Sequence, residues 1–215
     1  MTLQFPTGEG NLINYNWSDL ATGTGYKTFY CTANIVGSSV GYILEPETLP
    51  SHLTNTNAVN TSQEVNFDLL FNVSTKLKGN AIINIPVAAW NASGDSRGLS
   101  VTSTIKLYKV AVGGTETQLG STISHDLVYS VYKTADPQAA FGYEMFAGKV
   151  TIPNTTFKPG ESLRVEVVIG ASGYTNIYMI ICHDPKNYGL NFGGYDVPKV
   201  LTTTSSINLP FKINL

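Results

Sequence analysis

The stretch that decides the fold is residues 100–121, SVTSTIKLYKVAVGGTETQLGS. β-Branched and aromatic residues dominate its first arm, as a half-buried strand prefers. Gly113-Gly114 stands where the apolar pattern ends, and glycine adopts positive φ without steric cost. The return arm, 115–120, is mostly polar. The stretch predicts a long β-hairpin with a primed turn at Gly113-Gly114 and a polar return face that points to water.

Further strands are expected wherever apolar residues alternate, or run on, between Gly, Pro and Asn. The clearest is 161–169, whose alternate positions are aliphatic and are predicted to face the core: Leu163, Val165, Val167 and Ile169. Gly79-Asn80 predicts a turn, 153–160 predicts a loop, and Pro86 predicts an edge strand or a bulge. About ten strands and no substantial helix indicate an all-β protein, an antiparallel β-sandwich of jelly-roll type.

The 215 residues suit one large β-sandwich domain, 1–215, with two small domains as the alternative. Within it, 1–25 is expected to form an extended N-terminal arm and 199–215 a C-terminal strand segment. The two cysteines, Cys31 and Cys182, lie in apolar runs. They would either bridge adjacent strands or remain buried free thiols, and we expect free thiols.

Charge excludes several classes of partner. Charged residues are 13% of the chain and the net charge is −2, so there is no basic surface for nucleic acid or for a membrane. No apolar run approaches the roughly 20 residues that span a bilayer. The first residues, MTLQFPTGEG, lack the features of a signal peptide, which predicts synthesis in the cytoplasm without conventional export.

Two patterns suggest metal ligands, but neither has a standard spacing. His125-Asp126 and His183-Asp184 repeat a dipeptide that would supply two histidines and two carboxylates. The loop 91–98, NASGDSRG, offers oxygen ligands but a single carboxylate, which is too few for tight Ca²⁺ binding. We expect turn and surface residues in both places, with no metal and no cofactor.

Catalytic motifs are missing from the sequence. There is no GxSxG, P-loop or HExxH, and no GxGxxG stands in the right context. Glu45 and Glu47 are the nearest pair of carboxylates, and a glycosidase needs two such groups across a cleft. Because they stand in a Pro-rich loop, the sequence predicts that the protein is not an enzyme.

Aromatic residues near glycines and loops are the candidate binding residues, because such rings stack on sugars or form subunit interfaces. The alternative is that they cap the ends of the core. The candidates are Trp17, Trp90, Tyr188, Phe192 and Tyr195.

Two segments resemble β-sandwich structural proteins from the virions of tailed viruses, such as capsid decoration, head-fibre and tail proteins. They are the hairpin KLYKV–GGTET–LG, within 106–120, and TFKPGESLRVEV, 156–167. The resemblance implies a self-associating viral structural protein on the particle surface, without catalytic residues. A carbohydrate-binding module or lectin is the alternative function, and a small hydrolase is the third.

The resemblance also sets the expected partners. These are other virion proteins and further copies of the chain, with a trimer favoured, while a glycan is a second kind of ligand. Neither nucleic acid nor a membrane is expected as a partner. The expected location is the virion, after synthesis in the host cytoplasm.

Overall fold

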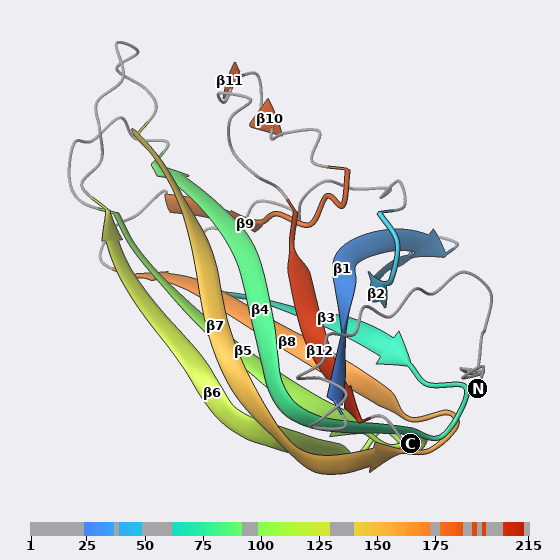
Figure 1. Cartoon of the computed structure of the whole chain (residues 1–215). Coiled ribbons are helices and arrows are strands. Elements are labelled where there is room, and N and C mark those ends of the chain that lie inside the picture. The colour runs from blue at the N-terminus through green and yellow to red at the C-terminus, as the bar shows by residue number, and fades with distance from the viewer. Residues whose placement is uncertain are drawn as a thin grey trace.

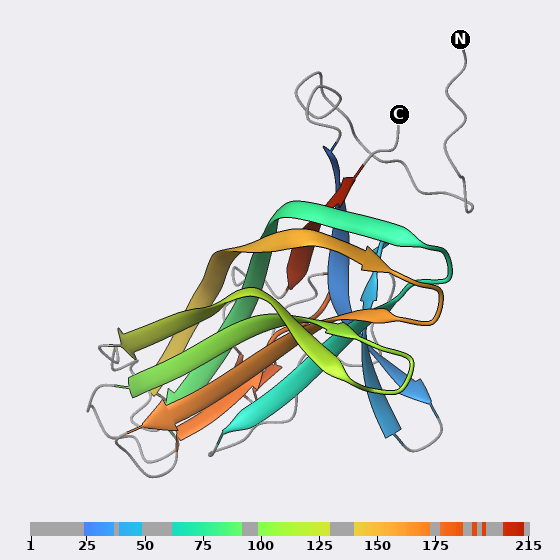
Figure 2. The ribbon, with the colours of Figure 1, turned by 90° about the horizontal axis from the view of Figure 1, so that it is seen from below.

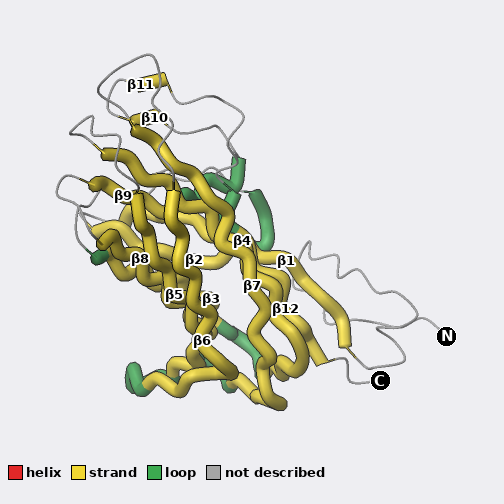
Figure 3. The backbone as a smooth tube through the Cα atoms, turned by 90° about the vertical axis from the view of Figure 1, so that its left-hand side faces the viewer, coloured by secondary structure: helices red, strands yellow, loops and turns green. Residues whose placement is uncertain are grey.

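A computed structural model describes residues 24–36, 39–48, 62–91, 99–129, 140–172, 177–186, 191–192, 195–196 and 204–212. Every regular element in these ranges is a strand (Figure 3), which confirms the all-β class. The strands are β1 (Thr24–Val36), β2 (Ser39–Glu45), β3 (Gln63–Leu70), β4 (Thr75–Asn91), β5 (Leu99–Val110), β6 (Glu116–Tyr129), β7 (Ala140–Phe157), β8 (Ser162–Ser172), β9 (Ile177–Ile181), β10 (Asn191–Phe192), β11 (Tyr195–Asp196) and β12 (Ser206–Lys212). No helix of the described ranges has the length and apolar character needed to cross a membrane.

Ten strands form one curled sheet in the order β6-β5-β8-β3-β2-β1-β12-β4-β7, with β9 also paired to β4 (Figure 1). The short strands β10 and β11 pair separately. Neighbours are antiparallel except β2 and β3, which share one parallel bridge, so the sheet is mixed where the sequence predicted an antiparallel one. The end strands β6 and β7 contact each other, and the curled sheet encloses its own core (Figure 2).

The core lies between the two halves of this curled sheet. The four aliphatic residues predicted to point inward from β8 are all fully buried, which confirms the predicted face: Leu163, Val165, Val167 and Ile169. β3 pairs with β8 so that Phe67 stands opposite Val165 and Leu69 opposite Leu163. Both cysteines are buried, as predicted, and both are free thiols in the structure.

Two glycines allow β6 to approach β7 closely. A Cβ on Gly120 would lie 2.5 Å from the backbone oxygen of Thr151, and a Cβ on Gly148 would lie 2.4 Å from the Ile123 side chain. Gly120 also has φ of 71° and follows Leu119 at a register shift between β5 and β6. Such a bulge bends its strand and increases the twist. This bend brings the two ends of the sheet together.

The hairpin β5–β6 forms as predicted, but its turn differs. The amide of Gly114 donates to the carbonyl of Ala111 (2.8 Å), and the amide of Ala111 donates to the carbonyl of Thr115 (2.9 Å). Gly114 has φ of 83°, whereas Gly113 is not among the described glycines with positive φ. The loop is therefore the longer type, closed by one left-handed glycine, and not a primed two-residue turn.

Gly79 and Pro153 do not end strands, contrary to the prediction of a turn and a loop. β4 runs through Gly79, which has φ of 125° beside a register shift at Leu77, and β7 runs through Pro153 to Phe157. The ladder pairs Leu77 with Thr155 and Gly79 with Ile152, so Pro153 falls within the irregularity. A bulge absorbs both residues because it leaves one position without a ladder partner.

β12 lies between β1 and β4 and completes the sheet with residues from the predicted C-terminal segment. β4 then changes its partner from β12 to β9: Asn84 pairs with Ser206, and Val87 pairs with Ile181. Pro86 stands at this change, where its carbonyl accepts a hydrogen bond from the amide of Cys182 (2.9 Å). The side of Pro86 that lacks an N–H is the side on which β4 passes from β12 to β9. Pro86 therefore lies at this change of partner strand, and not at the predicted sheet edge or bulge.

Candidate functional site

Ser205 lies next to the point where β4 exchanges its neighbour β12 for β9, and it bonds to segments from elsewhere in the chain. The Ser205 hydroxyl donates to the carbonyl of Cys182, and its own carbonyl accepts from the amide of Cys31 (3.0 Å). The Thr204 hydroxyl donates to the carbonyl of Asp184 (3.3 Å). Ser205, His183 and Asp184 are all buried. These bonds fix the segment after β9, and with it the backbone of His183.

His183 lies against two aromatic rings of neighbouring strands. Its ring meets Tyr42 of β2 at 5.5 Å with an interplanar angle of 78°, and Phe67 of β3 at 6.0 Å and 62°. Tyr42 and Phe67 are themselves edge-on at 5.4 Å. Burial raises the pKa of Tyr42, because the phenolate is poorly solvated there. This aromatic cluster supports the β2 strand immediately before its end.

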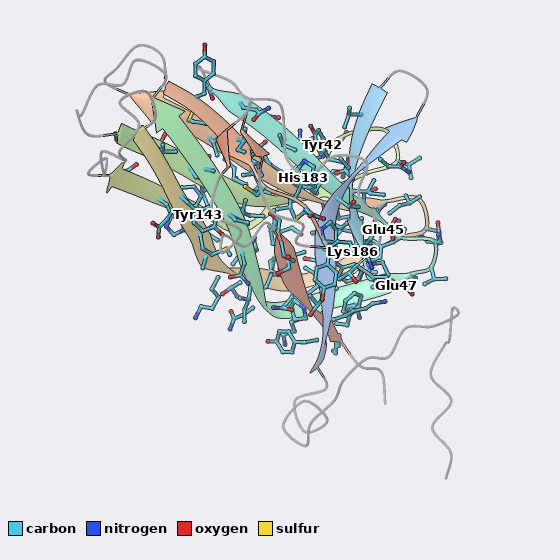
Figure 4. The ribbon with its side chains drawn as sticks, turned by 90° about the horizontal axis from the view of Figure 1, so that it is seen from above. Tyr42, Glu45, Glu47, Tyr143, His183 and Lys186 are labelled. Atoms are coloured by element: carbon cyan, nitrogen blue, oxygen red, sulfur yellow. The ribbon has the colours of Figure 1, made fainter. Side chains whose placement is uncertain are left out.

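The end of β2 and the residues just after it carry two carboxylates, one of which interacts with a lysine of β1. Glu45 is the last residue of β2 and pairs with Tyr30 of β1, while Glu47 follows it after Pro46. Lys27 lies three positions earlier on β1 than Tyr30, and its Nζ is 5.2 Å from the centre of the Phe29 ring. Figure 4 shows Glu45 and Glu47 in one region of the molecule, with Tyr143 well apart. We call Lys27, Glu45 and Glu47 the β2-end cluster.

The members of the β2-end cluster influence one another electrostatically. Partial burial raises the pKa of Glu45, and the negative charge of Glu47 raises it further. Partial burial lowers the pKa of Lys27, and the charge of Glu47 acts in the opposite direction. A carboxyl that keeps its proton beside a second carboxylate has the arrangement that general acid–base catalysis uses. Chemically, the cluster can donate one proton and accept another.

Sequence reasoning found the two glutamates, but not the interaction of Lys27 with Glu47 or the packing of Tyr42 against His183. The register of β1 on β2 and the path of the chain after β9 decide those contacts, and neither leaves a local signal. The isolated charge of Lys27 in the strand GYKTFYC was the one feature that could have indicated it.

The predicted aromatic binding residues are not gathered by the described structure. Trp17 and Tyr188 lie outside the described residues. Trp90 belongs to β4, in backbone register with Phe141 and Tyr178. Phe192 and Tyr195 pair with each other across β10 and β11. These five residues therefore remain sequence predictions.

The two His-Asp dipeptides lie in different surroundings. His125 of β6 stacks on Phe146 of β7 at 5.3 Å and 27°, whereas His183 contacts β2 and β3. Within the described ranges, no three His, Cys, Asp or Glu residues are placed to hold a metal ion. His52 and the loop residues 92–98 lie outside those ranges.

No protein-family model matches the chain, and neither does any curated protein. Several solved structures are similar. A CocE/NonD family hydrolase from Staphylococcus aureus is 18% identical, with 87% of this chain and 37% of that chain covered and a TM-score of 0.43. An α-amino acid ester hydrolase is 13% identical, with coverages of 70% and 25% and a TM-score of 0.42. The VP2 subviral particle of infectious bursal disease virus is 11% identical, with coverages of 84% and 42% and a TM-score of 0.21.

These comparisons correct the functional prediction. The hydrolases match with probability 1.00, against 0.69 for the viral particle. The predictions of a viral structural protein and of no enzymatic activity are therefore corrected, because the structures that match with probability 1.00 are hydrolases. The predicted resemblance to virion proteins is supported only by a weak likeness to VP2 of infectious bursal disease virus, and not by a likeness to proteins of tailed viruses. The chain spans 37% and 25% of the two hydrolase chains. With TM-scores below 0.5, none of these likenesses assigns a role to a residue.

Proposed function

We propose that the chain belongs to a hydrolase and that the β2-end cluster supplies its acid and base, with Glu45 as proton donor and Glu47 as proton acceptor. The observation that carries this proposal is the position of Glu45, which is half-buried at the end of β2 with a second carboxylate two residues away. Burial and like charge both favour the protonated carboxyl, so Glu45 keeps its proton to a higher pH than an ordinary glutamate.

The corresponding reaction cleaves a bond to oxygen in an ester or a glycoside. Glu47 takes a proton from the attacking water, and the water oxygen bonds to the carbon under attack. Glu45 gives its proton to the departing oxygen as the old bond breaks. Lys27 is close enough to Glu47 for the two charges to interact, and the charge of Glu47 raises the pKa of Lys27 against the effect of burial. Glu47 then releases its new proton to solvent and Glu45 takes one up, which restores both groups.

The test compares substrates whose leaving groups differ in their need for a proton. The full chain is assayed on alkyl and on nitrophenyl esters and glycosides, together with the variants Glu45→Gln and Glu144→Gln. Glu144 is a half-buried carboxylate of β7, four places from β2 in the sheet order, and serves as the matched control.

Glu45→Gln should lower kcat on alkyl substrates by about 10²- to 10⁴-fold, the usual contribution of a positioned acid. The loss on nitrophenyl substrates should be smaller, because nitrophenolate departs without protonation. Glu144→Gln should leave both rates unchanged. No turnover of either substrate class by the full chain, or equal rates for wild type and Glu45→Gln on alkyl substrates, would overturn the proposal.

A further inference from the structure

A second polar pair lies inside the curled sheet, on strands that the β2-end cluster does not use. Ser103 of β5 is directly opposite His125 of β6, and the described neighbours Val101, Ile105 and Ile123 on these two strands are apolar. Ser103 is 1% exposed, between the fully packed positions Val101 and Ile105. A hydroxyl in such a place needs a hydrogen-bond partner, because a buried polar group without one costs folding free energy.

Among the described residues, neither side chain provides that partner. Ser103 Oγ and His125 Nε2 are both buried, and both lack a hydrogen bond within the described ranges. They do not bond to each other, although directly opposite residues place their Cβ atoms only about 4.5–5.5 Å apart. A small molecule that lies between these two facing side chains is therefore a candidate partner for both.

The side chains around Ser103 and His125 restrict which molecule can bind between them. Ile169 of β8 pairs with Ser103 and is fully buried, while the His125 ring stacks on Phe146, which is 1% exposed. Ile169 and Phe146 carry no charge that would offset the lost hydration of an ion, so these two side chains favour a neutral molecule. A molecule that donates one hydrogen bond and accepts another satisfies a serine hydroxyl and a neutral imidazole nitrogen together.

We propose that Ser103 and His125 form a buried binding site for a single neutral hydroxyl group, supplied either by a water molecule or by a small alcohol. One structural water is common at buried polar places of this kind and makes two to four hydrogen bonds. His125 is half-buried, so movement of its exposed part gives the bound molecule a route for exchange.

The test follows the bound molecule by NMR on the full chain. A cross-relaxation signal between water and the His125 ring protons should appear, and Ser103→Val should abolish it, because the larger side chain fills the site. Titration with ¹³C-methanol provides the second arm. A saturating shift of the His125 resonances, with loss of the water signal, identifies an alcohol as the ligand, whereas an unchanged water signal identifies water.

Stability gives an independent measurement. Ser103→Ala should lower the folding equilibrium constant about fivefold, as the loss of one hydrogen bond does. Ser124→Ala is the matched control, because Ser124 is one residue from His125 on β6 but exposed on the outer face. No water signal and no methanol saturation, with Ser103→Ala at least as stable as wild type, would show an unsatisfied hydroxyl and overturn the proposal.

Discussion

At the scale of single residues, Glu45 couples the proposed site to the stability of the fold. Its pKa is raised in the folded protein by burial and by Glu47, so the folded state holds this proton more tightly than the unfolded state does. The unfolded chain therefore loses the proton first as the pH rises, from about pH 4.3 upward. As Glu45 ionises with rising pH, the free energy of unfolding should fall, and it should stay lower at neutral pH.

Glu45→Gln should remove this pH-dependent cost. We expect the melting temperature of the variant, relative to wild type, to rise between pH 4 and pH 7, because glutamine has no proton to lose. Glu144→Gln is measured beside it as the matched carboxylate on another strand, β7. Thermal unfolding followed by circular dichroism at several pH values measures both, and parallel curves for Glu45→Gln and wild type would contradict the expected coupling.

Three glycines of the β5–β6 hairpin allow the cost of a left-handed backbone to be measured apart from the cost of a steric clash. Gly120 combines φ of 71° with a close backbone neighbour, Gly114 has φ of 83° in open space, and Gly113 lies in open space without positive φ. Alanine should therefore destabilise most at position 120, by about 1–3 kcal/mol or more. It should cost about 1–2 kcal/mol at 114 and no more than about 0.5 kcal/mol at 113. Urea unfolding ranks the three, and equal losses at 113 and 120 would disprove the tight approach of β6 to β7.

At the scale of elements, β8 offers a direct test of the core. Val167 is fully buried and pairs with both Val65 and Ile105, whereas Val168 is half-buried on the opposite face. Val167→Ala should destabilise by about 1–3 kcal/mol through lost burial and a cavity, and Val168→Ala by clearly less. Denaturant unfolding of the two variants is sufficient, and a larger loss at Val168 would reverse the assigned faces.

Strands with a clear period of two were predictable, because their alternation requires only local sequence. β8 and the hairpin β5–β6 belong to this group. Gly79 and Pro153 misled the prediction because bulges absorb them within long strands, and a bulge depends on the register of the neighbouring strand. For the same reason Glu45 and Glu47 were found from sequence as neighbours, while Lys27 and the pair Ser103–His125 required the pairing of strands.

At the scale of the whole molecule, self-association remains a prediction from the low charge and the polar composition. We expect light scattering at tens of micromolar to give a mass about threefold that of the 23.2 kDa chain. The mass should change little with ionic strength, because few charges are available to hold the interface. A monomeric mass throughout the concentration range would contradict the predicted oligomer.

The position of β12 between β1 and β4 has a consequence for the order of events during synthesis. The side chains of Thr28 and Asn208 bond across 180 positions of sequence. At about 5–20 residues per second, a ribosome needs several seconds or more to cover that distance. From the time each is made until β12 is made, β1 and β4 lack their shared neighbour and expose unpaired backbone groups that would pair with other chains. The nascent chain therefore depends on β12 to complete the sheet, and a pause or truncation before residue 206 would leave it prone to aggregation.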